Sequence, residues 1–149
     1  PPRSPPPAQE FRAALAPASC DAGRNLGVHG GAKCHHRETV ARNRAGTVPD
    51  VEGFVSGPGP LDPMGPWQVS GTLWSTLDWT ESADHDWTVD AGNYLCNALF
   101  YYGVRAFPEK KLGFLHIPPF SEIPQSEQQA MLAEVIEEIK FAQAPRTKR

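Results

Sequence analysis

The stretch Asp90-Ala91-Gly92-Asn93-Tyr94-Leu95-Cys96-Asn97 decides the fold, together with Leu115-His116-Ile117-Pro118 further along the chain. The first stretch predicts the beginning of a helix that carries Cys96, and the second predicts the end of an apolar strand that carries His116. A thiol and an imidazole at neighbouring element ends can form a nucleophile–base pair. The two stretches therefore favour an α/β fold that carries the residues of a cysteine hydrolase.

The rest of the chain alternates between strand and helix patterns. We expect strands over residues 25–28, 73–77, 86–89 and 111–117, and helices over residues 10–15, 33–44 and 91–104. Near the C-terminus, Ser126 and Gln129 fit the capping box of another helix, in which apolar residues recur at three- and four-residue spacing. These residues are Met131, Leu132, Val135, Ile136 and Ile139. Strand–helix units in this order predict a parallel sheet covered by helices, with chemistry at strand carboxyl ends.

Length and charge argue against several classes of protein. With 149 residues the chain is one small domain, and a net charge of -3 with scattered Lys and Arg argues against nucleic-acid binding. No apolar stretch is long enough to span a membrane, and Pro1–Pro7 lacks the apolar core of a signal peptide. Three cysteines without such a signal predict reduced thiols in the cytoplasm. Because the chain begins without methionine, we expect a fragment or a processed product.

The chemistry centres on Cys96 and His116. Cys96 is the candidate nucleophile, with a buried small hydrophobe as the structural alternative. His116 is the candidate general base and later general acid, with a paired strand-end histidine as the alternative. A third group should orient the imidazole, and spacing alone does not select it. The candidates are Glu38, Asp50, Asp86 and Asp90, of which Asp90 is also a candidate cap for the helix of Cys96.

A second cluster of metal-ligating residue types follows the first expected strand. It consists of His29, Cys34, His35 and His36. The last three are consecutive, and no second Cys-x-x-Cys or His-x-x-x-His pair follows, so the spacing is poor for zinc. A polar loop and the first turn of a helix is the favoured interpretation, and we expect no metal and no cofactor.

At these residues the sequence resembles the pyroglutamyl-peptidase I (pyrrolidone-carboxylate peptidase) family of cysteine peptidases. The stretch 90–97 resembles the family's nucleophile motif, and Gly113-Phe114-Leu115-His116-Ile117-Pro118 resembles its histidine motif. A third match runs from Leu26 through Glu38-Thr39-Val40-Ala41-Arg42-Asn43 to Gly53 and resembles the segment that holds the family's glutamate. The resemblance covers about residues 25–143.

The resemblance implies a catalytic triad of Cys96, His116 and Glu38, without a cofactor. The implied reaction is hydrolysis of the amide that follows an N-terminal pyroglutamyl residue of a peptide, in the manner of a cysteine-type omega peptidase. The implied fold is a three-layer α/β/α sandwich around a mostly parallel mixed sheet, incomplete in this chain. The expected parts are a disordered, non-homologous proline-rich segment (1–24), a partial catalytic domain (25–143) and a basic tail (144–149). A homo-oligomer is a further expectation.

Several features depart from the family's pattern. Nothing before Asn25 resembles the family's first strand and its Gly-Phe-x-Pro-Phe-like loop, which helps to form the pyroglutamyl pocket. Asn25 stands in place of a histidine, and Thr47 lies where bacterial members place an arginine near the oxyanion. The stretch between Leu77 and Asp90 is short for the family's helix. These departures leave an alternative hypothesis, a truncated, non-catalytic relative that acts as a remnant or an interaction partner.

Overall fold

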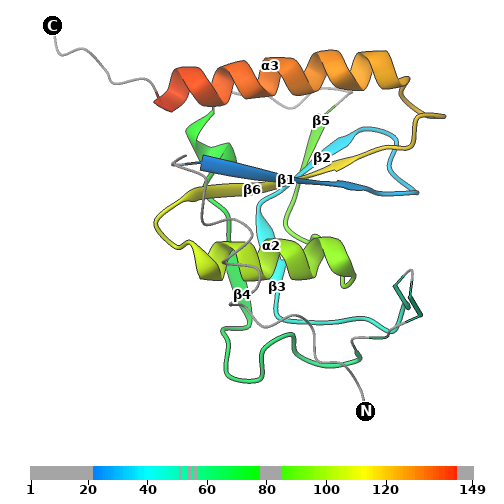
Figure 1. Cartoon of the computed structure of the whole chain (residues 1–149), viewed down its shortest axis with the longest axis vertical. Coiled ribbons are helices and arrows are strands. Elements are labelled where there is room, and N and C mark those ends of the chain that lie inside the picture. The colour runs from blue at the N-terminus through cyan, green and yellow to red at the C-terminus, as the bar shows by residue number, and fades with distance from the viewer. Residues whose placement is uncertain (1–21, 51, 54, 56, 78–84, 144–149) are drawn as a thin grey trace, which may run out of the picture.

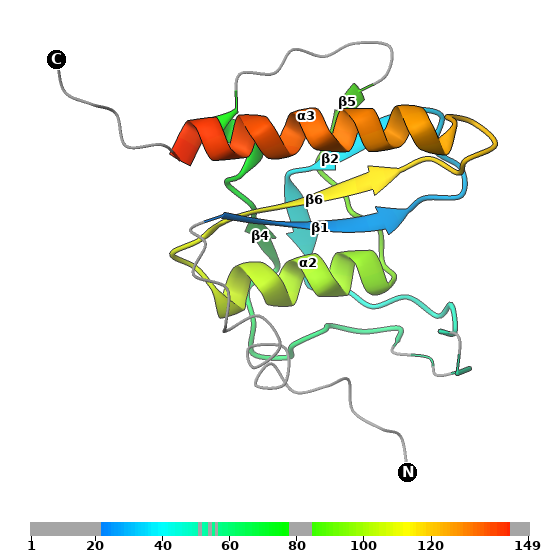
Figure 2. The ribbon, with the colours of Figure 1, turned by 45° about the horizontal axis from the view of Figure 1, so that its top comes forward.

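Three layers, helix, sheet and helix, make up the described part of the chain (Figure 1, Figure 2). The computed structural model describes residues 22–50, 52–53, 55, 57–77 and 85–143. A four-stranded sheet lies between α2 (Leu95–Ala106) on one face and α3 (Gln125–Gln143) on the other. The predicted α/β class, with a mostly parallel mixed sheet between helices, is confirmed. None of the described helices combines the length and the apolar character needed to cross a bilayer.

The order of strands in the sheet is β1 (Ala22–Val28), β6 (Lys111–Ile117), β2 (His35–Glu38) and β5 (His85–Thr88). β1 runs parallel to β6 and β2 runs parallel to β5, whereas β6 and β2 are antiparallel. The register sets Gly27 beside His116 and Glu38 beside Thr88. Residues from all four strands therefore lie close together around His116 and Glu38.

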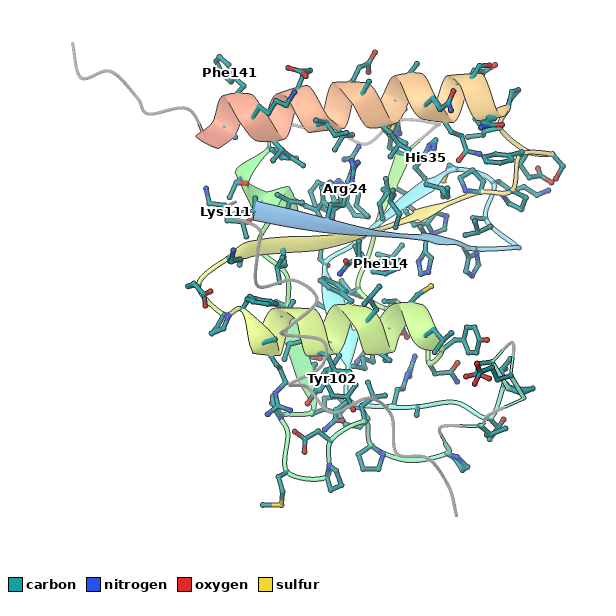
Figure 3. All side chains as sticks on the ribbon, in the orientation of Figure 1. Arg24, His35, Tyr102, Lys111, Phe114 and Phe141 are labelled. Atoms are coloured by element: carbon teal, nitrogen blue, oxygen red, sulfur yellow. The ribbon has the colours of Figure 1, made fainter. Side chains whose placement is uncertain are left out.

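Alternation along the strands sends side chains to the two faces of the sheet. Phe114 lies between β6 and α2, whereas Arg24 lies on the α3 side of β1 (Figure 3). Residues 112–116 of β6 are all buried, as expected for a strand covered by a helix on each face. His116 follows Phe114 by two positions and therefore faces α2, on the same side as the residues of the site.

Each helix packs on the sheet through its own apolar cluster. α3 contributes Met131 and Val135, which pack with Leu115, Trp74 and Ala22. On the other face, the side chains of α2 pack against β6 and the short strand β3 (Val40–Arg42). That cluster consists of Ala41, Ala91, Phe100, Tyr101 and Phe114. The spacing predicted for α3 is thus confirmed at Met131 and Val135, whereas Ile136 is 43% exposed.

The predicted helix over residues 33–44 is wrong, since this segment forms β2 and β3 (Val40–Arg42). β2 pairs with β6 on one side and β5 on the other, and β3 pairs with β4 (Gln68–Ser70). Histidines and β-branched residues give the segment little intrinsic helix preference. Pairing with three other strands therefore decides its conformation.

The predicted strand over residues 73–77 is also wrong. The segment forms a 3-10 turn, Trp74–Thr76, and Trp74 is buried on the face of the sheet that α3 covers. The indole N–H donates to the backbone carbonyls of Glu38 and Phe114, at 3.2 Å each. Gly113 leaves room for the ring, because an added Cβ there would lie 2.9 Å from the indole. Burial of this ring between β2 and β6 favours the turn over an extended strand.

The other predicted boundaries agree to different degrees. β6 spans the predicted residues, β5 begins one position early at His85, and β1 begins at Ala22, before the predicted start. α3 begins at Gln125, so Ser126 lies inside the helix and the predicted capping box is wrong. The buried Gln128 side chain instead donates to the carbonyls of Pro118 and Ile123 just before the helix. The helix expected over residues 10–15 lies outside the described residues.

Candidate active site

Cys96 is the second residue of α2. The amides of a first helical turn have no intrahelical acceptors, and this positive end of the helix dipole favours anionic groups. Helix N-termini are accordingly sites where cysteine is stabilised as a thiolate. The helix begins at Leu95, later than predicted, after an extended Tyr94 that gives no side-chain cap. The fold thus presents the thiol at the end of a helix that packs on the sheet.

Asp90 does not cap α2, although the sequence had made it a candidate for the cap of this helix. Its carboxylate accepts a hydrogen bond from the Gly92 amide at 3.0 Å and lies 2.6 and 2.7 Å from Arg44 Nη2. Gly92 has a φ of +85°, a left-handed conformation that favours glycine. Asp90 therefore shapes the loop before α2 and ties it to the segment after β3.

Asn97 fixes the first turn of α2 on that same segment. Its side chain is fully buried, and its Oδ1 accepts a hydrogen bond from the Arg42 amide at 2.8 Å. Its Nδ2 donates to the carbonyls of Arg42 and Arg44, at 2.8 and 3.0 Å. The three bonds hold the residue next to Cys96, so they also set where the thiol lies.

The Cys96 thiol lies against β1 and beside His116. A Cβ added at Gly27 would come within 2.6 Å of Cys96 Sγ, so the sulfur rests on the bare backbone of β1. Gly27 is the register partner of His116 in the neighbouring strand. The thiol and the imidazole form a side-chain hydrogen bond. The structure thus brings together the two residues with which the sequence pattern began.

Glu38 completes a hydrogen-bonded chain with them. Its Oε1 lies 2.7 Å from His116 Nδ1, and the two residues are 2% and 4% exposed. This pairing leaves Nε2 of the ring for Cys96. Burial alone would lower the pKa of His116, but hydrogen bonds and charge interactions with Cys96 and Glu38 raise it to about 9. The ring is therefore an imidazolium at neutral pH, held between a thiol and a carboxylate.

Thr88 holds the second oxygen of that carboxylate, a contact that the sequence analysis did not predict. The Thr88 hydroxyl donates to Glu38 Oε2, and the carbonyl of Thr88 accepts hydrogen bonds from the amide and hydroxyl of Thr39. Glu38 and Thr88 are register partners in the parallel pair of β2 and β5. A threonine in a short strand carries no distinctive signal, and only that register reveals its contact.

His29 lies at the open side of the site, just after β1. Its ring is 5.4 Å from the His116 ring and 6.0 Å from the His36 ring, measured between centroids. Burial and the neighbouring His116 and His36 lower the pKa of His29, and Glu38 opposes them. His29 is therefore a mostly neutral neighbour of the imidazolium at neutral pH.

The other carboxylates considered from the sequence lie elsewhere. Asp50 Oδ1 accepts a hydrogen bond from the Glu52 amide at 2.9 Å, in the loop after β3. Asp86 is exposed on β5, and its Oδ1 accepts from the Trp87 amide at 2.7 Å. Of the four candidates, the structure places only Glu38 against His116.

The cluster weighed as a zinc site does not converge. His36 faces the α2 side with His29, whereas His35 faces the opposite side, 5.4 Å from the ring of His85. In the described parts of the chain, no group of three or more His, Cys, Asp or Glu side chains could hold a metal ion. His35 and His36 are adjacent in the sequence, but alternation along β2 sends their side chains to opposite faces of the sheet.

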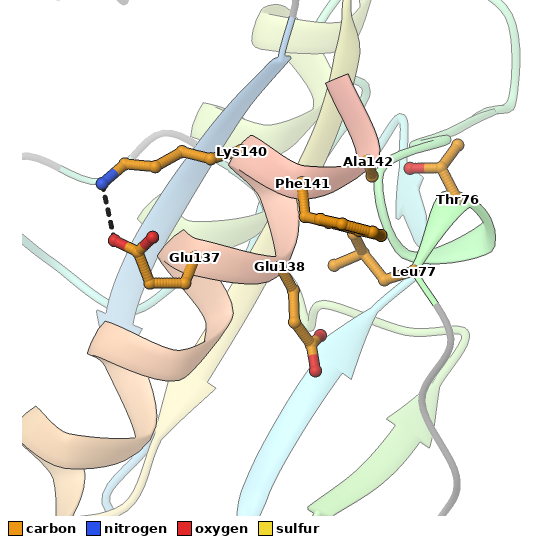
Figure 4. A pocket seen from close by; sticks show the side chains of 7 residues that line it. All are labelled: Thr76, Leu77, Glu137, Glu138, Lys140, Phe141 and Ala142. Atoms are coloured by element: carbon orange, nitrogen blue, oxygen red, sulfur yellow. Dashed lines mark hydrogen bonds and ion pairs between the residues drawn. The ribbon is translucent and has the colours of Figure 1, made fainter. Parts of the chain in front are cut away.

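A hollow of about 840 Å³ lies on the α3 side of the molecule, away from the thiol (Figure 4). The last turns of α3 form one wall, and the 3-10 turn forms the other. Its lining residues are Thr76, Leu77, Glu137, Glu138, Lys140, Phe141 and Ala142. Since Cys96 and His116 lie on the α2 face, this hollow is not part of the candidate active site.

Searches against protein-family models and curated proteins find no match to the chain. Solved structures do match. The pyrrolidone carboxyl peptidase of Thermus thermophilus is 28% identical, with a TM-score of 0.71 over 87% of this chain and 75% of that one. For the pyroglutamyl peptidase I of Bacillus amyloliquefaciens the identity is 22%, the TM-score 0.73 and the coverage 93% and 73%.

The pyrrolidone carboxyl peptidase of Thermococcus litoralis matches at 18% identity and a TM-score of 0.71, over 95% of this chain and 76% of that one. At this identity, and at that of the Bacillus structure, the similarity shows a shared fold only. The Thermus structure adds a higher identity over the same architecture. The resemblance to the pyroglutamyl-peptidase I family predicted from the motifs is thus confirmed, and the chain is a structural relative of the pyrrolidone carboxyl peptidases.

Proposed function

We propose that this chain is a cysteine-type omega peptidase that removes N-terminal pyroglutamyl residues from peptides. The observation that carries the proposal is the hydrogen-bonded chain from Cys96 through His116 to Glu38, at the N-terminus of a helix. A nucleophile, a base and a group that orients the base are the parts that covalent acyl transfer requires. The similar structures are a pyroglutamyl peptidase I and a pyrrolidone carboxyl peptidase, and these names support the substrate class.

In the first half of the reaction, Cys96 Sγ attacks the carbonyl carbon that joins the pyroglutamyl ring to the next residue. A thiolate is the reactive form of cysteine, and the neighbouring imidazolium of His116 compensates its charge. The oxyanion that forms lies near the first turn of α2, where the Cys96 amide is a candidate donor. His116 then protonates the departing amine, which leaves a pyroglutamyl thioester on Cys96.

In the second half, His116 is neutral and acts as a base. It takes a proton from water, and the hydroxide attacks the thioester carbon, which releases pyroglutamate and restores the Cys96 thiolate beside the protonated His116. Glu38 keeps Nδ1 of the ring protonated and so presents Nε2 to the reacting groups. No step needs a metal or a redox cofactor.

The proposed activity also bears on the cellular compartment, the peptide substrates and the oligomeric state of the protein. A catalytic thiol must stay reduced, and thiols stay reduced in the cytosol, so we place the protein in the cytoplasm. Its partners would be peptides with an N-terminal pyroglutamyl residue, bound where His29 and His36 border the open side of the site. Assembly into a homo-oligomer stays a proposal that a sedimentation measurement would settle.

Turnover of a fluorogenic pyroglutamyl amide by the purified chain tests the function. We expect cleavage by the wild-type chain and a loss of about 10³-fold or more in Cys96→Ser, because the hydroxyl is a far weaker nucleophile beside this base. Cys34→Ser is the matched control, since it removes a thiol from the loop before β2 and should leave turnover unchanged. Absence of cleavage by folded wild-type protein would contradict the proposal.

A further inference from the structure

Gly27 has a relationship to the thiol that no other glycine of the described chain shares. A Cβ at this position would lie 2.6 Å from Cys96 Sγ and 2.9 Å from Phe114 Cζ. Real Cβ atoms do not approach other heavy atoms so closely, so a side chain here forces something to move. The glycine lies within β1, where glycine otherwise weakens a strand, and such a glycine commonly marks a close approach.

The two neighbours of Gly27 differ in how easily they can move. Phe114 is fully buried, and its ring packs in the cluster between the sheet and α2. Moving it would disturb close-packed neighbours. Cys96 Sγ, in contrast, is the end of a short side chain that reaches another staggered position by one rotation about χ1. The thiol is therefore the group that moves furthest, while the Phe114 ring must also give by a few tenths of an ångström.

We propose that Gly27 is a positioning residue that seats the Cys96 thiol against His116. Gly27 and His116 are register partners in adjacent strands, so the space that the missing side chain leaves lies beside the imidazole. The sulfur occupies that space and forms its hydrogen bond with His116 from there. The inference deepens the proposed function, on which its catalytic part rests, while the thiol–imidazole contact is measurable without any turnover.

Gly27→Ala tests this role, with Gly23→Ala as the matched control. Both residues lie in β1 and face α2, but a Cβ at Gly23 would meet only the end of the flexible Leu112 side chain, at 2.9 Å. In Gly27→Ala we expect kcat to fall at least about 100-fold with KM nearly unchanged, because a displacement near 1 Å has effects of this size. Gly23→Ala should retain activity.

Alkylation by iodoacetamide gives the readout that is independent of turnover. It is measured against pH in a Cys20→Ser, Cys34→Ser background, so that only Cys96 reacts. We expect the alkylation profile of Gly27→Ala to differ from that of the wild-type chain, because the displaced thiol no longer lies beside the imidazole of His116. Circular dichroism confirms that each variant is folded.

The possible outcomes separate the two proposals. A shifted alkylation profile in Gly27→Ala, in a chain that never cleaves the pyroglutamyl amide, supports the seating role and contradicts the proposed function. Unchanged alkylation and unchanged kcat in folded Gly27→Ala overturn the seating role and leave the proposed function intact. If Gly27→Ala does not fold, Gly27→Ala/Phe114→Leu relieves the contact with the ring and keeps the sulfur. An alkylation profile that differs from that of Phe114→Leu alone supports the seating role, and an identical profile contradicts it.

Discussion

His116 Nδ1 and Glu38 Oε1 lie 2.7 Å apart on adjacent antiparallel strands, and both side chains are almost wholly buried. A buried imidazole and carboxylate are costly to desolvate unless each satisfies the other. The ring is also hydrogen-bonded to Cys96, so its two nitrogens face two chemically different partners. This arrangement fixes the orientation of the ring, with Nδ1 toward the carboxylate and Nε2 toward the thiol.

Glu38→Gln should reduce kcat/KM by about 10²–10⁴-fold, the range for loss of a well-oriented acid–base group. The amide can no longer hold the charged ring, and it can present an N–H where the imidazole also carries one. Initial rates with the fluorogenic pyroglutamyl amide measure the change. Glu122→Gln is the control, because Glu122 forms a surface ion pair with Lys33. Equal activity of Glu38→Gln and wild-type chains would contradict the orienting role.

Thr88→Val should lower kcat by about tenfold, because Glu38 Oε2 then loses its hydroxyl donor and the carboxylate is less firmly held. Valine preserves the shape of the side chain in β5. Thr88→Ser keeps the hydroxyl and should restore most of the rate, a rescue that a purely steric role would not produce. Steady-state kinetics of the two variants side by side measure the effect, and a valine variant as active as serine would exclude it.

Asn97→Ala should destabilise the fold by roughly 2–4 kcal/mol, since it removes three hydrogen bonds to buried backbone groups of Arg42 and Arg44. Urea unfolding followed by tryptophan fluorescence measures this difference. Asn93→Ala is the comparison, because the side chain of Asn93 is exposed and precedes the helix. We expect a change within about 0.5 kcal/mol there. Similar losses in both variants would show that Asn97 does not anchor α2.

The raised pKa of His116 predicts a pH-dependent stability. The unfolded chain releases this proton near pH 6.5, whereas the folded protein holds it to about pH 9. The contribution of the protonated ring is therefore complete below pH 6.5 and is lost as the pH rises through about 9. We expect the free energy of unfolding of the wild-type chain to decline over this window more steeply than that of His116→Asn. Parallel declines in the two proteins would contradict the raised pKa.

The sequence predicted some parts of the site because they rest on local patterns. The apolar run of β6 placed His116, and the helix pattern before it placed Cys96, without any knowledge of pairing. Glu38 could not be separated from Asp50, Asp86 and Asp90 by spacing, because all four are carboxylates in short segments between turns. The family resemblance selected Glu38, and the strand pairing explains its place against His116.

Other parts depended on contacts between distant segments. Residues 35–42 form strands because β5, β6 and β4 pair with them, and such pairing leaves no trace in local propensity. Thr88 touches Glu38 only through the register of β2 and β5. Gly27 did carry a signal, since a glycine inside an apolar strand indicates a close approach, although the partner is visible only in three dimensions.

The central claim is that Cys96 forms a thioester with the pyroglutamyl group. Rapid acid quenching during turnover of the pyroglutamyl amide, followed by mass spectrometry of the peptide that contains Cys96, tests it most directly. We expect a pyroglutamyl adduct on Cys96 in the wild-type chain, a larger adduct fraction in a variant that hydrolyses the thioester slowly, and no adduct in Cys96→Ala. Turnover without any adduct on Cys96, and equally fast in Cys96→Ala, would contradict it.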